Sequence, residues 1–440
     1  MWCLTIDLGA TFIKGAAVDL DTGRMAHVIR RPFPSFATDR ASGVREVPIA
    51  EVVSAVGSLL EELVNCAPEA NSVFWCGQMH GLVLCDGVGR PLSDFISWQD
   101  QRSVQTEPGA PASSYDVLQN LVTHADLVDL GREFSPRHPV ATLHWLTRQG
   151  RLPRGAYAAS LTDFMVAHFA KVPPLTHPTN ASAHGLFSLI AGNWHMELIE
   201  RIGLGMLAWP EIAREMEPTR QIQIGGRRLT CYPGIGDQQA ALLGADLRED
   251  ELSLNIATGS QVSLLTRDLR LGDYQVRPFP GGKYLQTVTH LPAGRALNAL
   301  LGLLGELPAA QGTPLRQPWE LVSKAVSEVS STDLTADLAF FNCAVGQEGG
   351  LSHLREDNLR VGHLFLAAFL NMAHNYHDAA LRLAPRQDWT RVVFSGGLAQ
   401  KLPALRAGIL ERLGSNHRVV DEPEDTLAGL RNLARSVLPA

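Results

Sequence analysis

The chain has 440 residues, of which 45% are hydrophobic and 19% charged, with 39 glycines and 26 prolines. This composition is typical of a globular protein with many turns and excludes a largely disordered chain, and the length suits two domains of about 200 residues each. The formal net charge of -7, with no local cluster of Lys and Arg, excludes an electrostatic surface for nucleic acid.

The six cysteines are scattered along the chain, with no Cys-x-x-Cys pair and no histidine spacing that indicates zinc. The first residues contain no basic or apolar leader, and no apolar run reaches the roughly 18 residues of a membrane span. We therefore expect reduced thiols and a cytoplasmic protein without a membrane partner.

The first thirty residues predict an antiparallel meander. Short β-favouring runs at 3–6 and 13–18 flank a glycine turn, and residues 19–23 form a hairpin connection to a third strand. Apolar residues at helical spacing predict a helix over 47–65, followed by a buried strand at 73–76. The pattern indicates a meander that leads into an α/β unit.

The chain then continues with polar loops and helices of the same α/β domain. A loop bounded by glycines, Gly77-Gln-Met-His-Gly81, leads into a strand at 82–85, and residues 104–114 are loop by composition. Helices are predicted at 139–149, 161–170 and 195–203.

The strand pattern restarts after residue 245. Strands at 252–256 and 261–265 flank a glycine turn, an arrangement that echoes the start of the chain and indicates a weak internal duplication. The remaining predicted elements are a helix at 361–383, a strand at 391–394, a helix to 413, a strand at 417–420 and a helix at 426–437. The sequence therefore predicts two domains, residues 1–245 and 246–440.

Two glycine-bearing hairpin turns, one in each domain, have the composition of phosphate-binding loops, because small residues let backbone N–H groups approach phosphate oxygens. Asp7 ends the first strand, where a carboxylate can hold hydrated Mg²⁺, and Lys14 can add a point charge. Each turn alone is an ordinary hairpin. Asp7, the turn at 258–260 and Ser395-Gly-Gly397 together indicate a polyphosphate site.

The stretch from Tyr232 to Ala245 places one carboxylate, Asp237, after two glycines and before a run of good helix formers. Acids at a helix start are usually caps, so this stretch alone favours a structural role. A tight turn can equally deliver such a carboxylate to a reacting group.

Five motifs in this order resemble the FGGY carbohydrate kinases of the actin and hexokinase superfamily, over nearly the whole chain. The matching segments are Asp7-Leu-Gly-Ala-Thr-Phe-Ile-Lys14, Gly77-Gln-Met-His-Gly81 with Trp98-Gln-Asp-Gln-Arg102, Gly236-Asp237, Asn255-Ile-Ala-Thr-Gly-Ser260, and Phe394-Ser-Gly-Gly397. The resemblance implies an α/β fold of two actin/hexokinase-like (ribonuclease H-like) domains with a cleft between them. It also implies ATP-dependent phosphorylation of a ketose at its terminal hydroxyl.

The resemblance assigns a role to each matching position. Asp237 would be the general base that accepts the proton of the attacking hydroxyl, and Asp7 would hold Mg²⁺ through water. The residues implied for ATP are Asp7, Gly9, Thr11, Lys14, Thr258, Gly259, Ser260, Asn298, Gly396 and Gly397. Those implied for the sugar are Gln78, Met79, His80, Trp98, Asp100, Asp237 and Gln238.

Single residues favour one subgroup of ketose kinases over another. Trp98-Gln99-Asp100 and Gly236-Asp237-Gln238-Gln239-Ala240 are closer to the sedoheptulokinases, whereas xylulokinases usually have Trp-Asn-Asp and Gly-Asp-Asn-Ala. The segment from Thr179 to Gly185 favours the same choice. Sedoheptulose is thus the expected substrate, and a pentulose such as xylulose is the alternative.

Some residues depart from the family pattern or keep a structural alternative. Ala10 replaces the usual Thr, the 346–353 segment matches the family loosely, and Gly429-Leu430 replaces a run of small residues. Arg102 can be a salt-bridge partner of Asp100. Taken singly, His80 and Trp98 would also be structural residues.

Two further questions concern the class of protein and its assembly. A non-catalytic actin-like protein that binds sugar or nucleotide would lack the base or the metal carboxylate, and both Asp237 and Asp7 are present. His374 and His377 share a helix face without a third ligand, so no metal is expected there. The sequence does not distinguish a monomer from a homodimer.

Overall fold

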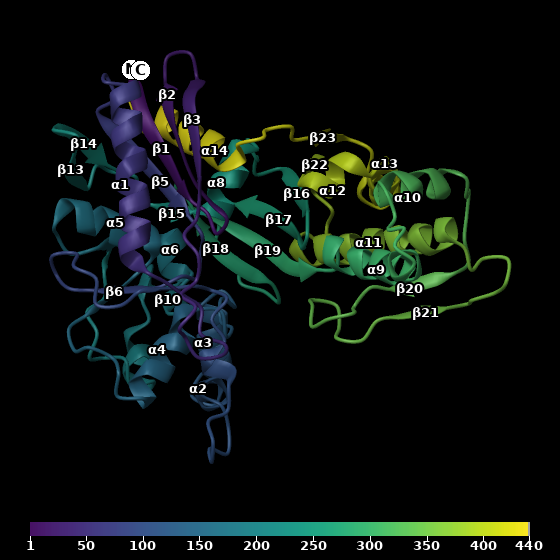
Figure 1. Ribbon diagram of the computed structural model, residues 1–440, viewed down its shortest axis with the longest axis horizontal. Helices are drawn as coiled ribbons and strands as arrows, with labels where there is room; N and C mark the ends of the chain where they lie inside the picture. The colour runs from purple at the N-terminus through teal and green to yellow at the C-terminus, as the bar shows by residue number, and fades with distance from the viewer. Residues whose placement is uncertain (439–440) are drawn as a thin grey trace.

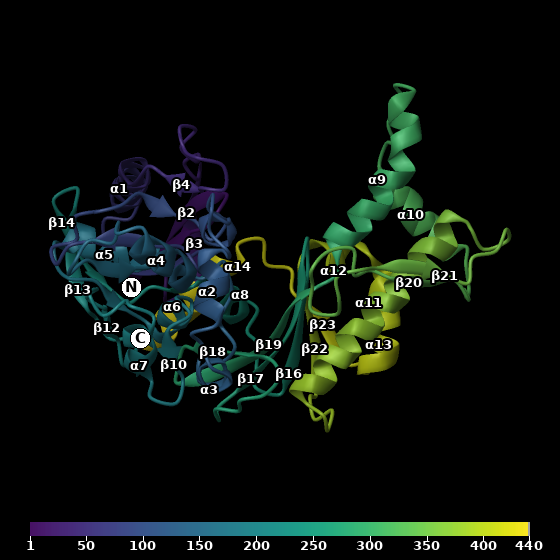
Figure 2. The same ribbon diagram turned by 90° about the horizontal axis from the view of Figure 1, so that it is seen from below.

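The computed structural model describes residues 1–438, which form two α/β parts (Figures 1 and 2). We call residues 1–244 the first half and residues 251–438 the second half. The first half contains a sheet of seven strands: β1 (Trp2–Leu8), β2 (Phe12–Asp19), β3 (Arg24–Pro32), β5 (Ser72–Gly77), β13 (Arg220–Ile224), β14 (Arg227–Cys231) and β15 (Ile235–Gly236). Their order is β13-β14-β5-β1-β2-β3, and β15 also pairs with β5.

The start of the chain confirms the predicted meander. Strands β1, β2 and β3 are antiparallel, whereas β5 runs parallel to β1 after the crossover helix α1 (Ile49–Cys66). This helix buries an apolar face that includes Val56, Leu59 and Leu63 against the strand residues Leu4 and Ile6. The 3.6-residue spacing of these side chains is what makes the helix cover the sheet.

Shorter elements between these strands carry the polar loops of the first half. They are β4 (Glu46–Val47), β6 (Val83–Cys85), β7 (Phe95–Ile96), η1 (Arg102–Val104), α2 (Ser114–Gln119), α3 (His124–Asp129), α4 (Pro139–Arg148), β8 (Tyr157–Ala159), α5 (Leu161–Ala170), β9 (Leu175–Thr176), α6 (Pro178–Ser182), β10 (Phe187–Ser188), β11 (Asn193–Trp194), α7 (Met196–Arg201) and β12 (Glu211–Ile212). The predicted helices at 139–149 and 161–170 are confirmed within one residue, and α7 is shorter than predicted.

The second half repeats the architecture of the first. Its sheet contains β16 (Glu251–Ile256), β17 (Ser260–Thr266), β18 (Gln275–Phe279), β19 (Lys283–Leu291), β22 (Arg391–Ser395) and β23 (His417–Val419). The order is β18-β19-β17-β16-β22-β23, with antiparallel pairing up to β16 and parallel pairing beyond it. The predicted duplication is therefore present as a repeated arrangement of strands.

The other elements of the second half cover this sheet or extend from it. They are α9 (Gly294–Ala310), α10 (Pro318–Ser327), β20 (Thr335–Asp337), β21 (Gly350–Ser352), α11 (Val361–Leu383), α12 (Gly397–Lys401) and α13 (Pro403–Leu413). Helix α11 has the predicted bounds and packs through Phe365, Met372 and Tyr376 on the sheet. Figure 2 shows α9 projecting away from the rest of the second half.

Where the two halves meet, one helix from each half packs against the sheet of the other half. Helix α8 (Asp237–Gly244) follows a strand of the first sheet, yet its Leu242 packs against Leu285 and Val393 of the second. Helix α14 (Asp425–Val437) follows β23, yet its Leu430 packs with Phe74 of the first sheet. In Figure 1 the yellow α14 lies among the purple strands of the first half. The predicted boundary near residue 245 stays a proposal, since α14 returns to the first sheet.

The helices α8 and α14 cross at two glycines. A Cβ atom on Gly429 would lie 1.7 Å from the carbonyl oxygen of Ala240, and one on Gly244 would lie 2.0 Å from that of Asp425. Both contacts are with backbone, which cannot move aside as a side chain can. The crossing therefore requires glycine at both positions.

Two further expectations concern the cysteines and the membrane. All six cysteines are free thiols. Among residues 1–438, no helix combines the length and the apolar character needed to cross a bilayer.

Candidate active site

Asp237 is delivered to the space between the halves by a short strand and a glycine. Strand β15 pairs in parallel with β5, which puts Gly236 beside Gly77. A Cβ atom on Gly236 would collide with the Gln239 side chain and would lie 2.8 Å from the sulfur of Met79, so these side chains would have to move. The backbone N–H of Gln238 donates to Asp237 Oδ1 at 2.8 Å, which leaves Oδ2 free of protein hydrogen bonds among the described residues.

The surroundings of Asp237 favour its neutral form. Burial is the main cause that raises its pKa to about 7, and the nearby carboxylate of Asp7 adds to the rise. The hydrogen bond from Gln238 and the charge of Arg277 act in the opposite direction. A carboxyl group with a pKa near neutral pH is well matched to accepting a proton from a hydroxyl.

Asp7 lies at the end of β1 with a carboxylate that is only partly satisfied. Thr426 of α14 donates a hydrogen bond to Asp7 Oδ2 at 2.7 Å, and the Lys14 ammonium lies 3.2 Å from the same oxygen. Burial raises the pKa of Asp7, while Lys14 lowers it. Asp7 Oδ1 is buried without a hydrogen-bond partner among the described residues. An orphaned carboxylate oxygen of this kind fits a hydrated cation.

A cavity of ≈ 610 Å³ brings residues of both halves together around Asp237. From the first half it is lined by Ala10, Gln78, Met79, His80, Trp98, Asp237 and Gln238. From the second half it is lined by Asn255, Gln261, Arg277, Ser395, Gly396, Gly397, Asp425 and Thr426. Its wall is therefore mixed, because Ala241, Leu242, Ala245, Val420 and Pro423 add apolar surface beside these polar groups.

A second cavity of ≈ 840 Å³ adjoins the first. The two share the lining residues His80, Trp98, Asn255, Gln261 and Arg277. Gly259 and Ser260 line only the second cavity, together with basic side chains that include Arg137 and His290. The space around Asp237 therefore continues past His80 and Trp98.

Residues 2–244 match the model of the FGGY family of carbohydrate kinases, N-terminal domain. The chain belongs to this family. It is an ATP-dependent sugar kinase, and the resemblance inferred from the motifs is confirmed.

Known proteins of the family are distant in sequence and close in fold. This kinase is 22% identical to a sedoheptulokinase of Mus musculus, over 92% of its own chain and 91% of the relative. It is 24% identical to a xylulose kinase of Staphylococcus xylosus, over 69% of its own chain and 64% of the relative. The crystal structure of xylulose kinase from Rhodospirillum rubrum superimposes with a TM-score of 0.82 at 18% identity, covering 98% of this chain and 88% of that one. The predicted two-domain α/β fold is thereby confirmed.

Asp100, which the motifs predict for the sugar site, forms the ion pair with Arg102 that the sequence left open as an alternative. Its carboxylate is 3% exposed and accepts two hydrogen bonds from the Arg102 guanidinium, both at 2.8 Å, and one from the backbone N–H of Arg45 at 2.7 Å. Asp100 lines neither of the two cavities. Its oxygens are taken by this buried ion pair, so the predicted contact of Asp100 with the sugar would require these hydrogen bonds to rearrange.

Several residues predicted for the nucleotide site do not line the cavity around Asp237 or are already bonded to other protein groups. Ser260 is buried, and its hydroxyl donates to the Leu291 carbonyl and accepts from the Tyr376 hydroxyl, so it is not free to donate to phosphate. Asn298 is exposed on α9 and lines neither cavity. Lys14 is held between Asp7 and Glu424. Gly9, Thr11 and Thr258 flank lining residues without lining the cavities themselves.

Two residues that the motifs do not include, Arg277 and Glu133, form a buried ion pair beside the two cavities. Arg277, on β18, is 6% exposed and lines both cavities, and its guanidinium donates to Glu133 and to Gln238. Glu133 is fully buried. One signal for Arg277 was visible in the sequence, because a charged residue inside the apolar run Gln275-Val-Arg-Pro-Phe279 needs a buried partner.

Proposed function

We propose that the kinase transfers the terminal phosphoryl group of ATP to the terminal hydroxyl of a ketose, with Asp237 as the general base. The observation that carries this proposal is the position of Asp237, which lines the cavity between the halves with a pKa raised to about 7. A hydroxyl placed against Asp237 Oδ2 would lose its proton as it attacks phosphorus. Gln78, Met79, His80, Trp98 and Gln238 then surround the sugar.

The nucleotide side of the proposed site fits ATP and Mg²⁺. Gly396 adopts φ +86° at the start of α12, and a Cβ atom there would lie 2.5 Å from the Ile256 carbonyl oxygen. The turn before α12 therefore requires glycine, because any side chain there would collide with the backbone of β16. The unpaired Oδ1 of Asp7 would hold the metal ion through water. Bound Mg²⁺ would neutralise charge on the transferred phosphoryl group.

The pH dependence of the reaction is a direct prediction from Asp237. A general base works only when it is deprotonated, so kcat/KM for the sugar should rise with pH and level off above about 7. At one pH unit below the pKa of Asp237, kcat/KM should be roughly tenfold lower than its plateau at high pH. The check is ADP release measured directly at subsaturating sugar, from pH 5.5 to 8.5. A profile that stays flat across this range would contradict the assignment.

Sedoheptulose is the substrate that we favour, and xylulose is the alternative. A sedoheptulokinase is similar over 92% of the chain, and Gln238, one of the residues that favours heptulose kinases, lines the cavity. The continuation of the cavity past Trp98 supports a chain longer than five carbons. Gln99 is exposed and Gln239 is fully buried, so these two residues no longer contribute to the choice.

A panel of acceptors tests the choice of sugar. ADP release should be measured with sedoheptulose, xylulose, ribulose, fructose and glycerol at equal concentrations. We expect the highest kcat/KM with sedoheptulose. Activity confined to xylulose would select the pentulose alternative, and activity confined to glycerol would exclude both ketoses.

A further inference from the structure

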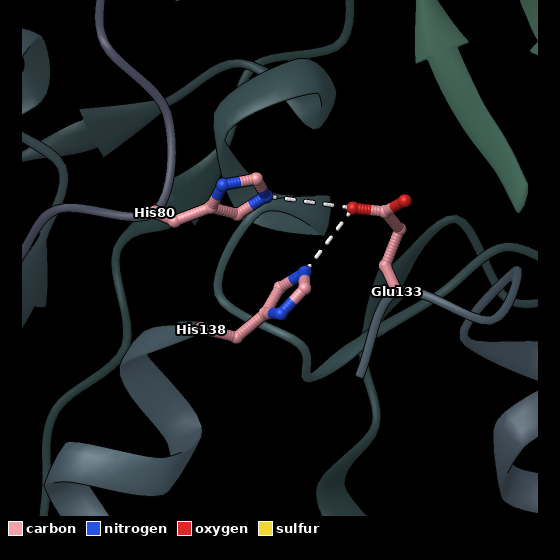
Figure 3. Close-up of side chains that lie close together, drawn as sticks. All are labelled: His80, Glu133 and His138. Atoms are coloured by element: carbon pink, nitrogen blue, oxygen red, sulfur yellow. Dashed lines mark hydrogen bonds and ion pairs between the residues drawn. The ribbon is translucent and has the colours of Figure 1, made fainter. Parts of the chain in front are cut away.

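Glu133 lies in the loop before α4, beside the cavity around Asp237. It contacts residues from both halves of the chain and accepts hydrogen bonds from both (Figure 3 shows the histidine pair). From the first half, His138 Nε2 donates to Glu133 Oε2 at 3.2 Å, and His80 Nε2 lies 3.5 Å from the same oxygen without a hydrogen-bond partner among the described residues. From the second half, Arg277 Nε and Gln275 Nε2 both donate to Glu133 Oε1 at 2.8 Å. One carboxylate thus lies against four side chains and accepts hydrogen bonds from three of them.

The carboxylate of Glu133 is ionised in spite of its complete burial. Burial alone would raise its pKa, but the Arg277 charge and the two nearby histidines hold the pKa well below its usual range. An ionised group without contact with water is costly unless it is paired and hydrogen-bonded. Glu133 meets both conditions through residues that also line the cavity.

Two of these partners extend the network to the reacting end of the site. His80 lines both cavities, and its ring faces Glu133 (Figure 3). Arg277 donates from its other side to Gln238, the residue that follows the base, and Gln238 in turn donates to Gln261 at 3.1 Å. The orientation of His80 and Arg277, which both line the cavities, therefore depends on the Glu133 carboxylate. Glu133 itself lines neither cavity.

The cluster of His80, Glu133 and His138 also has the size of a metal-ligand set, since the three donor atoms lie within 4.8 Å of one another. Two features argue against a resident cation. The guanidinium of Arg277 lies on the same carboxylate and already matches its charge. Gln275 occupies the same oxygen, Oε1. Arg277 therefore balances the charge of Glu133, and a bound cation is an alternative that the experiment below tests.

We propose that Glu133 is a positioning residue that fixes His80 and Arg277 in the orientation that binds the sugar, and that it controls through Arg277 the electrostatic field at Asp237. The proposal rests on the sugar occupying the cavity around Asp237, but not on which sugar it is. Glu133 itself touches neither sugar nor nucleotide in this arrangement.

The test is the Glu133→Gln variant, which keeps the shape of the side chain and removes its charge. KM for the sugar should rise roughly tenfold or more, the worth of a hydrogen bond to a charged group, while kcat changes much less. The unmatched charge of Arg277 should also stabilise the Asp237 carboxylate, so the acid limb of kcat/KM should move to lower pH. In Arg277→Gln the same limb should move to higher pH.

The opposite pH shifts separate positioning from loss of structure. The other charged or titratable groups that act on Asp237 are Asp7 on β1, Asp425 on α14 and Cys76 on β5, and neither variant changes them. Glu251→Gln is the matched control, because Glu251 is 2% exposed and paired with Arg418 at 2.7 Å on the far strand of the second sheet. It should lose stability without a change in KM or in the pH profile.

Several outcomes would overturn the proposal. Glu133→Gln with an unchanged KM, or with an acid limb that does not move, would exclude a positioning role. If Glu133→Gln does not fold, Arg277→Gln must still show the shift to higher pH, or the proposal fails. Calorimetric binding of Zn²⁺ that disappears in His138→Ala would make the cluster a metal site instead. All assays use the acceptor that the wild-type enzyme phosphorylates best, so a wrong ketose would not be mistaken for a failure of Glu133.

Discussion

Replacing Asp237 by Asn is expected to lower kcat by roughly 10²-fold or more, the scale of losing a general base, while the sugar still binds. The amide keeps an oxygen that can accept the hydrogen bond from the Gln238 backbone, which is 2.8 Å long in the native enzyme. It cannot take the proton of the attacking hydroxyl. The measurements are single-turnover phosphorylation for the chemical step and calorimetry for the sugar. Turnover near that of the wild type would remove Asp237 from the mechanism.

Asp163→Asn is a matched control for this variant. Asp163 is a buried aspartate, 2% exposed, and burial raises its pKa to about 6, as it raises that of Asp237. Its carboxylate accepts a hydrogen bond from the Thr176 hydroxyl at 2.7 Å inside the first half, and it does not line the cavity around Asp237. This variant should retain kcat. The acid limb of the pH profile should persist in Asp163→Asn and disappear in Asp237→Asn.

The regular elements and the glycine turns could be predicted from the sequence because their signals are local. Helix α11 has the predicted bounds, and the repeated strand, turn, strand pattern marks the start of both sheets. Gly396 and Gly236 stand where a side chain would collide with backbone or with Met79, so their presence in the motifs follows from close packing. The predicted residues Gln78, Met79, His80, Trp98 and Gln238 do share one cavity with Asp237.

The direction of a side chain within a motif was not predictable in the same way. The sequence left two roles open for Asp100, a contact with the sugar and an ion pair with Arg102, and did not decide between them. The Arg102 guanidinium and the Arg45 backbone take both oxygens. The hydroxyl of Ser260 is likewise taken by Tyr376, 116 positions away. Such competition depends on which groups the fold brings close, which residue type and spacing do not specify.

Glu133 and Arg277 were missed because their roles come from a contact across 144 positions. Glu133 lies in a loop without periodicity or motif. Its role follows from the ion pair with Arg277 on β18, which only the folded chain brings close. The same reason applies to α8 and α14. Their apolar faces could be predicted, whereas the sheet that each face covers depends on the exchange between the two halves.

Replacing Gly429 by Ala is expected to lower the free energy of unfolding by about 1–3 kcal/mol or more, the cost of overpacking. The added Cβ atom would lie 1.7 Å from the Ala240 carbonyl oxygen, so the two helices must move apart. Because α8 begins with Asp237 and α14 carries Thr426, which donates to Asp7, this movement should also lower kcat. Denaturant unfolding and steady-state kinetics measure the two effects.

Gly408→Ala is the control that isolates the crossing. Gly408 lies inside helix α13, and an added Cβ atom there would meet no atom within 4 Å. Alanine is the better helix former, so this variant should gain roughly 0.5–1 kcal/mol of stability. The two glycine-to-alanine changes should therefore have opposite signs. If Gly429→Ala were as stable as Gly408→Ala and fully active, the close crossing of α8 and α14 would not be what fixes Asp237, at the start of α8, and Thr426, which donates to Asp7.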